Sequence, residues 1–248
     1  MARIIAMVNQ KGGVGKTTTA INLAYALSEF HGQKTLLVDI DTQANATSSL
    51  GFNPEQLEFS LYDVLIKKRP LQEVLLSRSD SLSIAPANLH LSGLSARDVN
   101  FSEKLLKIEE AEEFDFVIID CPPSLGVLTV LALSSATEVM VPVQAQFLAL
   151  EGTATLLKTV DLVRRKLNRR LRIGGVVCTM FDGRTKISRS IYGKLLEHFG
   201  ELVYRTKVGR DVRLEECPAY GMSIFEYAPR SRGARLYREL AQEVLDRG

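Results

Sequence analysis

Gln10-Lys11-Gly12-Gly13-Val14-Gly15-Lys16-Thr17-Thr18 is the stretch that decides the fold, because it follows the apolar run 4–8 and opens an amphipathic segment. Its glycines let consecutive backbone N–H groups turn toward one point, where they can surround a phosphate group. The start of the following helix adds a partial positive charge at the same point. The order of strand, glycine loop and helix therefore predicts a phosphate-binding site.

This order is the one that a nucleotide-binding P-loop requires. The plain pattern has glycine where Gln10 stands, so the loop is a variant form. We expect Lys16 to reach the β- and γ-phosphates of ATP and the Thr17 hydroxyl to bind Mg²⁺. The predicted nucleotide-binding residues are Lys11, Gly12, Gly13, Val14, Gly15, Lys16, Thr17 and Thr18.

A second lysine, Lys11, precedes the glycines at a position where an ordinary P-loop needs no lysine. It is either a solvated loop charge or a residue that crosses to the nucleotide of another subunit. The crossing requires two subunits face to face, with ATP between them.

Three aspartates end predicted strands and are candidates for the chemistry. Asp39 and Asp41 are two residues apart, so their side chains share a face beside the loop. One carboxylate can support the Mg²⁺ shell while the other orients water; the alternative is that both cap a solvated loop. Asp120 ends the apolar run 116–119, at the carboxyl end of a buried strand, where the ligands of α/β proteins collect.

Short aliphatic or β-branched runs alternate with amphipathic stretches, which predicts an α/β fold: a mostly parallel sheet with helices on both faces. The predicted strands are 3–8, 35–39, 83–85, 116–120, 138–142, 173–180 and 203–206. The predicted helices are 16–30, 60–67, 103–112, 128–135, 152–167, 187–199 and 233–246. No linker or repeat interrupts the pattern, so we expect residues 1–248 to form a single domain.

The chain resembles the ParA/Soj-type chromosome and plasmid partitioning ATPases, which belong with MinD to the deviant Walker A class of P-loop ATPases. The resemblance runs nearly end to end, through NQKGGVGKTTTAINLA, LLVDIDTQANATSSLG, DFVIIDCPPSLG, LALEG, VRLEECPAYG and PRSRGA. It implies an ATP sandwich homodimer in which Lys11 acts in trans and Gly12 lies at the crowded contact. The resemblance implies three catalytic residues: Lys11, Lys16 and Asp41. Of these, Asp41 positions the attacking water. The residues expected to bind the metal are Thr17, Asp39 and Asp120.

Two positions depart from the family pattern, which has proline at both. Thr42 follows Asp41 and is expected to loosen the loop around that carboxylate. Gly209 precedes Arg210, in a region that normally lies by the adenine base. The adenine contacts are therefore not assigned, and Thr179, Met180 and Val208 are only expected to be neighbours of the base.

The charge of the chain is unevenly distributed, although its net value is only +2. Residues 151–248 contain 20 Lys and Arg against 12 Asp and Glu, an excess of 8, whereas residues 1–150 contain 11 against 17. Such an excess suggests a polyanion as partner, although scattered solvated charge is the alternative. By the resemblance, Arg184 and Arg213 match DNA-contacting positions, and Arg230 extends the patch. The expected partners are nonspecific double-stranded DNA and a ParB-type activating protein, which places the protein in the cytoplasm on the nucleoid.

Three other functions could use such a P-loop. A membrane-positioning ATPase like MinD is the main alternative, but no basic amphipathic tail follows the last helix, so no stable membrane anchor is expected. An iron–sulfur carrier needs more cysteine ligands than Cys121, Cys178 and Cys217 provide. A small-molecule kinase or ligase would need an acceptor pocket, for which no motif is visible.

Overall fold

The runs rich in aliphatic and β-branched residues form one sheet in the computed structural model, which describes residues 2–98, 113–146 and 153–248. Its order is β3-β4-β2-β5-β1-β6-β7-β8. The strands are β1 (Arg3–Met7), β2 (Thr35–Asp39), β3 (Leu76–Ser77), β4 (Leu82–Ala85), β5 (Phe116–Asp120), β6 (Glu138–Gln144), β7 (Arg172–Phe181) and β8 (Val203–Gly209). All neighbours pair in parallel except β3 and β4, so the carboxyl ends of the parallel strands lie together. The predicted α/β class is confirmed.

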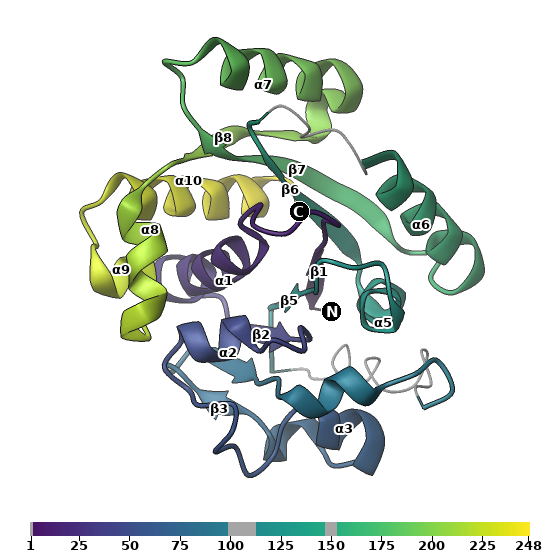
Figure 1. Cartoon of the computed structure of the whole chain (residues 1–248). Coiled ribbons are helices and arrows are strands. Elements are labelled where there is room, and N and C mark those ends of the chain that lie inside the picture. The colour runs from purple at the N-terminus through teal and green to yellow at the C-terminus, as the bar shows by residue number, and fades with distance from the viewer. Residues whose placement is uncertain (1, 99–112, 147–152) are drawn as a thin grey trace.

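Helices cover both faces of the sheet (Figure 1). One face packs against apolar residues of α3 (Leu61–Lys67), α5 (Val127–Ser135), α6 (Thr153–Lys166) and α7 (Lys186–Phe199). The other face packs against α1 (Lys16–His31) and α10 (Arg232–Asp246). Within α10, Leu236, Leu240 and Val244 are buried, which confirms that this helix docks onto the sheet.

Several short elements were not expected from the sequence: β3 and the helices α2 (Asn45–Ser49), α8 (Val212–Glu216) and α9 (Ile224–Tyr227). Each is too short to show a periodic pattern, and α9 is instead fixed by a capping box between Ser223 and Glu226. The predicted helix 103–112, the first residue of the predicted helix 152–167 and the LALEG segment lie outside the described residues. In the described part of the chain, no helix combines the length and the apolar character needed to cross a bilayer.

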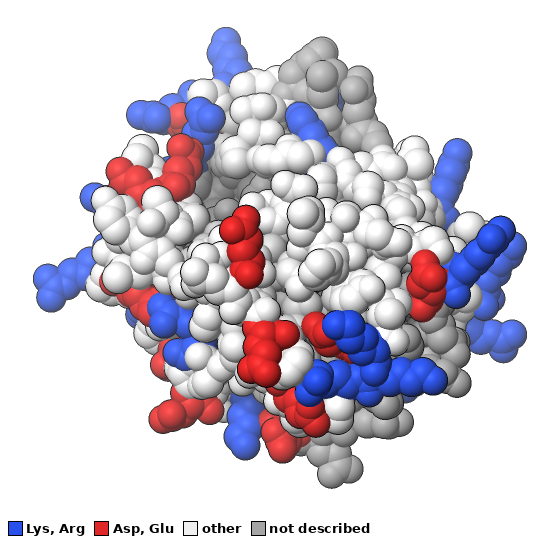
Figure 2. Space-filling model, turned by 60° about the horizontal axis from the view of Figure 1, so that its bottom comes forward, with Lys and Arg blue, Asp and Glu red and all other residues white. Residues whose placement is uncertain are grey.

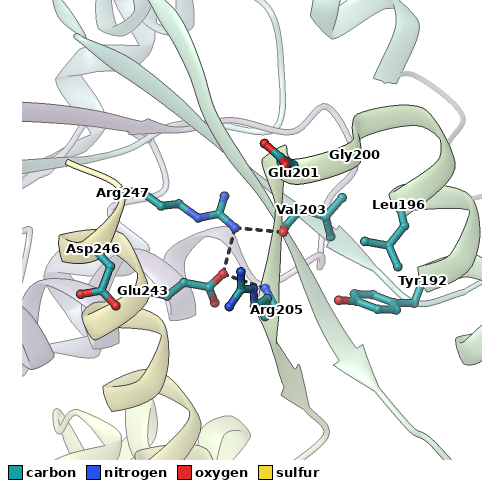
Figure 3. A pocket seen from close by; sticks show the side chains of 9 residues that line it. All are labelled: Tyr192, Leu196, Gly200, Glu201, Val203, Arg205, Glu243, Asp246 and Arg247. Atoms are coloured by element: carbon teal, nitrogen blue, oxygen red, sulfur yellow. Dashed lines mark hydrogen bonds and ion pairs between the residues drawn. The ribbon is translucent and has the colours of Figure 1, made fainter.

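Glu243 of α10 and Arg247, which caps the end of that helix, hold the outer strand β8 (Figure 3). Residues 204–206 stand opposite a single residue of β7, so this part of β8 leaves the regular ladder. Glu243 accepts hydrogen bonds there from the N–H groups of Arg205 (2.8 Å) and Thr206 (3.0 Å). Arg247 donates to the carbonyls of residues 202 and 203 and pairs with Glu243 at 2.8 Å. The pair thus satisfies backbone groups that the sheet leaves open.

Replacing Glu243 with glutamine is expected to lower the free energy of unfolding by about 1–2 kcal/mol at neutral pH, because one charge-assisted acceptor is lost. Burial alone would raise the pKa of Glu243, but hydrogen bonds from Arg205, Thr206 and Arg247 outweigh it and bring the pKa below its usual 4.5. The charged side chain therefore stabilises the fold above the unfolded-state pKa, and this contribution is lost as the pH falls through the folded-state pKa. Urea unfolding at decreasing pH should show the two proteins converging below about pH 4.5.

The matched control is Glu239→Gln, which removes a carboxylate whose ion pair with Arg235 is exposed. Exposed pairs of this kind contribute little, so its effect should stay below about 0.5 kcal/mol. Equal losses in the two variants would contradict the role assigned to Glu243.

Candidate functional site

The glycine loop has the backbone conformation that its composition predicts. Gly13 (φ 70°) and Gly15 (φ 86°) lie in the left-handed region, where a side chain would be strained. Gly15 is the N-cap of α1 and offers no side chain to cap its first N–H groups. These groups remain available for an anion at the positive end of a 16-residue helix dipole.

Two buried side chains fix the loop from either side. The Asn9 amide donates to the Pro142 carbonyl (2.7 Å), and its oxygen accepts from Lys11 N–H (3.0 Å). On the other side, the Thr179 hydroxyl donates to the Val14 carbonyl at 2.7 Å. Sequence reasoning missed these roles, because both anchors join segments more than a hundred residues apart.

Lys16 is the first residue of α1, directly after this loop, and only 7% of its surface is exposed. Burial lowers the pKa of Lys16, while the carboxylates of Asp120 and Asp41 act to raise it. The structure thus brings together the three charged residues that were predicted separately. The Lys16 ammonium makes one long hydrogen bond, to the Lys11 carbonyl at 3.5 Å, so it can readily turn to a phosphate group.

Asp120 is fully buried at the end of β5, and neither of its carboxylate oxygens has a hydrogen-bond partner among the described residues. Burial raises its pKa well above the ordinary range, as does the neighbouring Asp39, whereas Thr17 and Lys16 lower it. An unsatisfied buried carboxylate is costly, and a bound cation would remove that cost. Asp120 beside the Thr17 hydroxyl therefore fits a divalent metal that prefers oxygen ligands.

Asp39 pairs with Asp120 in the register of β2 and β5. One of its oxygens accepts from Thr47 N–H and from the Thr47 hydroxyl, both at 2.8 Å, and the other accepts from Asp41 N–H at 3.1 Å. Burial raises the pKa of Asp39 to about 6, against the effect of these hydrogen bonds. Both oxygens are engaged, so Asp39 holds the following loop in place; its predicted metal contact stays a prediction. Thr47 was not singled out in the sequence.

Asp41 begins the loop that follows β2 and is almost fully buried. Its Oδ1 accepts from Gln43 N–H (3.0 Å), and its carbonyl accepts from Ala44 N–H (2.9 Å). Of the two carboxylate oxygens, only Oδ1 accepts a hydrogen bond from a described residue, which leaves Oδ2 available. Within the described ranges, no three His, Cys, Asp or Glu side chains converge as a metal-binding group. A metal here would depend on Thr17, Asp120 and oxygen atoms from a ligand or water.

Comparisons with known proteins agree with this geometry. A family model described as an AAA domain matches residues 2–173. The chain is 42% identical to the sporulation initiation inhibitor protein Soj of Bacillus subtilis over 254 residues, which cover all of both chains. It is 46% identical to the chromosome-partitioning ATPase Soj of Thermus thermophilus over 245 residues, 99% of this chain and 96% of that protein. The chain belongs to the Soj/ParA family.

A solved structure shows how far this fold extends beyond Soj/ParA proteins. Cobyrinic acid a,c-diamide synthase from Mycobacterium smegmatis, with a bound ATP analogue and magnesium, superposes with a TM-score of 0.84 at 35% identity. The match covers 99% of this chain and 95% of that one.

A narrow cavity of about 60 Å³ adjoins the P-loop at Gly15 and Thr18. Its lining includes the three expected base neighbours, Thr179, Met180 and Val208. Gly209, one of the two departures from the Soj/ParA pattern, also lines it, and a Cβ atom there would lie 3.3 Å from the Phe181 carbonyl. Larger hollows lie elsewhere: about 620 Å³ between α7, β8 and α10 (Figure 3), and about 530 Å³ beside Thr42 and Gln43.

The three arginines predicted to contact DNA lie at the same end of the sheet as the P-loop. Arg184 follows β7, Arg213 follows β8, and Arg230 precedes α10. The Arg184 side chain is 91% exposed and donates three hydrogen bonds to the Asp182 carboxylate, at 2.8, 2.9 and 3.3 Å. Arg213 lies 3.7 Å from Asp211, and Arg230 has no ion pair with any described residue. All three arginines are accessible, and their contact with DNA stays a prediction.

Proposed function

We propose that this Soj/ParA protein is an ATP-dependent switch that moves DNA during chromosome or plasmid segregation. Mg·ATP drives formation of a sandwich homodimer, the dimer binds DNA without sequence preference, and hydrolysis stimulated by a ParB-type partner releases it. The observation that supports this most directly is the meeting of Lys16, Asp41 and an unpartnered Asp120 beneath the loop. The full-length relatives named as chromosome-partitioning proteins supply the cellular role.

Each residue of the site has a defined part in hydrolysis. Backbone N–H groups of residues 12–18 and the Lys16 ammonium hold the phosphates of ATP. Thr17 and Asp120, with Asp39 behind them, would hold Mg²⁺, which neutralises charge on the phosphate oxygens. Asp41 turns a water molecule toward the terminal phosphate through its available oxygen. Burial of these groups strengthens their electrostatic effect on the transition state.

The exposed rim of the P-loop supports the proposed homodimer. A Cβ atom on Gly12 would meet no heavy atom within 4 Å, so the chain itself does not require glycine there. The close approach of a second copy would supply that requirement. Lys11 stands next to Gly12. The described residues hold it through its backbone, by Asn9 and Lys16, so its side chain is available to reach across to the partner's nucleotide.

DNA binding is assigned to the exposed arginines at the P-loop end, with Arg184, Arg213 and Arg230 contacting phosphates. A monomer contacts few phosphates, whereas a two-fold dimer doubles the contacts on one duplex. The nucleotide thereby controls DNA binding. The base sequence of the DNA should matter little, because arginines that grip the backbone do not read base edges.

The test is duplex binding with ATP, with ADP and without nucleotide. Wild type should gain affinity only with ATP, and the Arg184→Ala, Arg213→Ala double variant should lose that gain. Removing one arginine–phosphate interaction should lower the slope of log affinity against log salt by roughly 0.9. Asp182→Ala is a matched control that should raise DNA affinity, because it frees the Arg184 side chain and removes a charge that repels the phosphates.

The proposal fails if the double variant, confirmed as an ATP dimer, keeps wild-type affinity and slope. It also fails if wild type binds DNA equally well with ADP. ATP-dependent binding to anionic vesicles in place of DNA would favour a MinD-like positioning ATPase.

A further inference from the structure

A hollow of about 530 Å³ opens beside the loop that carries Asp41. Residues 42–44 of this loop form one wall, and residues 88–90, at the start of a 3₁₀ helix (Leu89–Gly93), form another. None of the described residues assigned to ATP or Mg²⁺ lines the hollow. The nucleotide site therefore does not account for it, and the hollow is open to another molecule.

The first wall holds the Asp41 carboxylate in place. Gln43 N–H donates to Asp41 Oδ1 at 3.0 Å, and Ala44 N–H donates to the Asp41 carbonyl at 2.9 Å. Ala44 has φ 50°, in the left-handed region that a side chain disfavours, so the loop keeps this shape only while its surroundings hold it. Thr42 does not supply the fixed backbone angle of the proline found there in the Soj/ParA pattern. A molecule that contacts residues 42–44 would therefore act directly on the position of Asp41.

The second wall is connected to the metal side of the site. Ala87 N–H, directly before this wall, donates to the Thr47 hydroxyl at 3.0 Å, and that hydroxyl donates in turn to Asp39 at 2.8 Å. The Asn88 side chain accepts from His90 N–H at 3.2 Å, which fixes the start of the 3₁₀ helix. Each wall is thus linked by hydrogen bonds to one of the two carboxylates at the end of β2. A ligand that touches both walls would brace both carboxylates.

The lining of the hollow combines apolar surface with one carboxylate. Leu89 is 70% exposed, the highest value of any large apolar side chain that the structure describes, and Pro54 and Leu57 also line the hollow. Glu55 is exposed and has no ion pair with any described residue, and no Lys or Arg is among the lining residues. Figure 2 brings forward the side of the molecule where Figure 1 shows α2 and α3; Asp and Glu lie near the middle of this face, and most Lys and Arg lie toward its margins. The lining fits an apolar side chain next to a cation.

We propose that this hollow is the docking site for a segment of the activating partner, which places an apolar side chain on Leu89 and a lysine or arginine against Glu55. DNA does not fit here, because Glu55 repels phosphates and no cation lines the hollow to bind them. The bound segment restrains residues 42–44 and so keeps the available oxygen of Asp41 on the attacking water, which speeds hydrolysis. This docking site rests on the proposed partner-stimulated switch and adds the surface through which the stimulation acts.

The test measures ATP turnover of the full chain with DNA, while the ParB-type partner protein is titrated in. The docking variant is Glu55→Lys, Leu89→Ser, which changes two exposed side chains and should leave the fold intact. The control variant, Leu196→Ser, Glu197→Lys, makes the same two changes at exposed positions of α7, remote from the hollow. The partner concentration for half-maximal stimulation should rise on the order of tenfold or more in the docking variant and stay unchanged in the control. Turnover without the partner should be the same in wild type and both variants.

The outcomes separate the docking site from the function on which it rests. If the partner stimulates wild type and the docking variant equally, or if the control loses as much as the docking variant, the docking site is wrong while the ATP switch stands. If wild type is not stimulated at all, both the site and partner-stimulated hydrolysis are wrong. Light scattering with ATP checks a third result: a docking variant that no longer dimerises would show that a second copy of this chain, and not the partner, covers the hollow.

Discussion

Lys16→Ala is expected to abolish tight binding of Mg·ATP. The substitution removes a charge-assisted hydrogen bond to the phosphates worth about 1.5–3 kcal/mol, which corresponds to an affinity loss on the order of 10- to 100-fold. The upper end applies, because Lys16 is buried beside Asp120 and Asp41, and its loss leaves two carboxylates that repel the incoming phosphates. Equilibrium titration with a fluorescent ATP analogue measures the change.

Lys34→Ala is the control, because Lys34 is exposed at the start of β2, at the opposite end of that strand from the site. It removes the same charge from the chain and should leave nucleotide affinity unchanged. Unchanged affinity in Lys16→Ala, with the fold intact by circular dichroism, would show that the loop is not the nucleotide site.

Asp41→Ala is expected to bind ATP normally but to hydrolyse it on the order of 100-fold or more slowly, so that the protein accumulates as a dimer. Phosphate contacts come from the P-loop and persist, whereas the oxygen that orients water is removed. Light scattering with ATP should show a stable dimer, and phosphate release should show the loss of turnover.

Alanine at position 41 also removes the hydrogen bond from Gln43 N–H, so a second variant separates chemistry from loop geometry. Asp41→Asn keeps an oxygen that can accept this bond but has no carboxylate charge. Both variants should be inactive. Normal turnover in Asp41→Asn would mean that Asp41 shapes the loop without acting on water. If Asp41→Ala remains a monomer with ATP, the expectation of a trapped dimer is wrong.

The sequence was sufficient to predict the central strands and the P-loop, because these depend on local patterns. The run 116–120 is continuously apolar up to Asp120, and this is enough to identify a buried parallel strand with a ligand-facing end. Glycines at positions 13 and 15 show directly where the backbone needs left-handed conformations.

The parts that sequence reasoning missed depend on contacts between distant segments. Nothing local distinguishes Thr47 from other threonines, yet the fold places both its N–H and its hydroxyl on Asp39. Likewise, Asn9 is recognisable as an anchor only when β6 brings the Pro142 carbonyl beside it.

The hydrogen bonds of Glu243 and Arg247 to β8 have a consequence for how copies of this chain can assemble. An outer strand with open N–H and carbonyl groups is a template for adding another strand, and such backbone pairing leads to aggregation or open-ended growth. The Glu243 and Arg247 side chains occupy such groups within residues 202–206. An added strand would have to displace these hydrogen bonds, which disfavours strand addition there and favours association through side-chain surfaces such as the P-loop rim. In the proposed dimer, assembly through that rim would be reversed by a change of nucleotide, whereas a continuous sheet joining two chains would not.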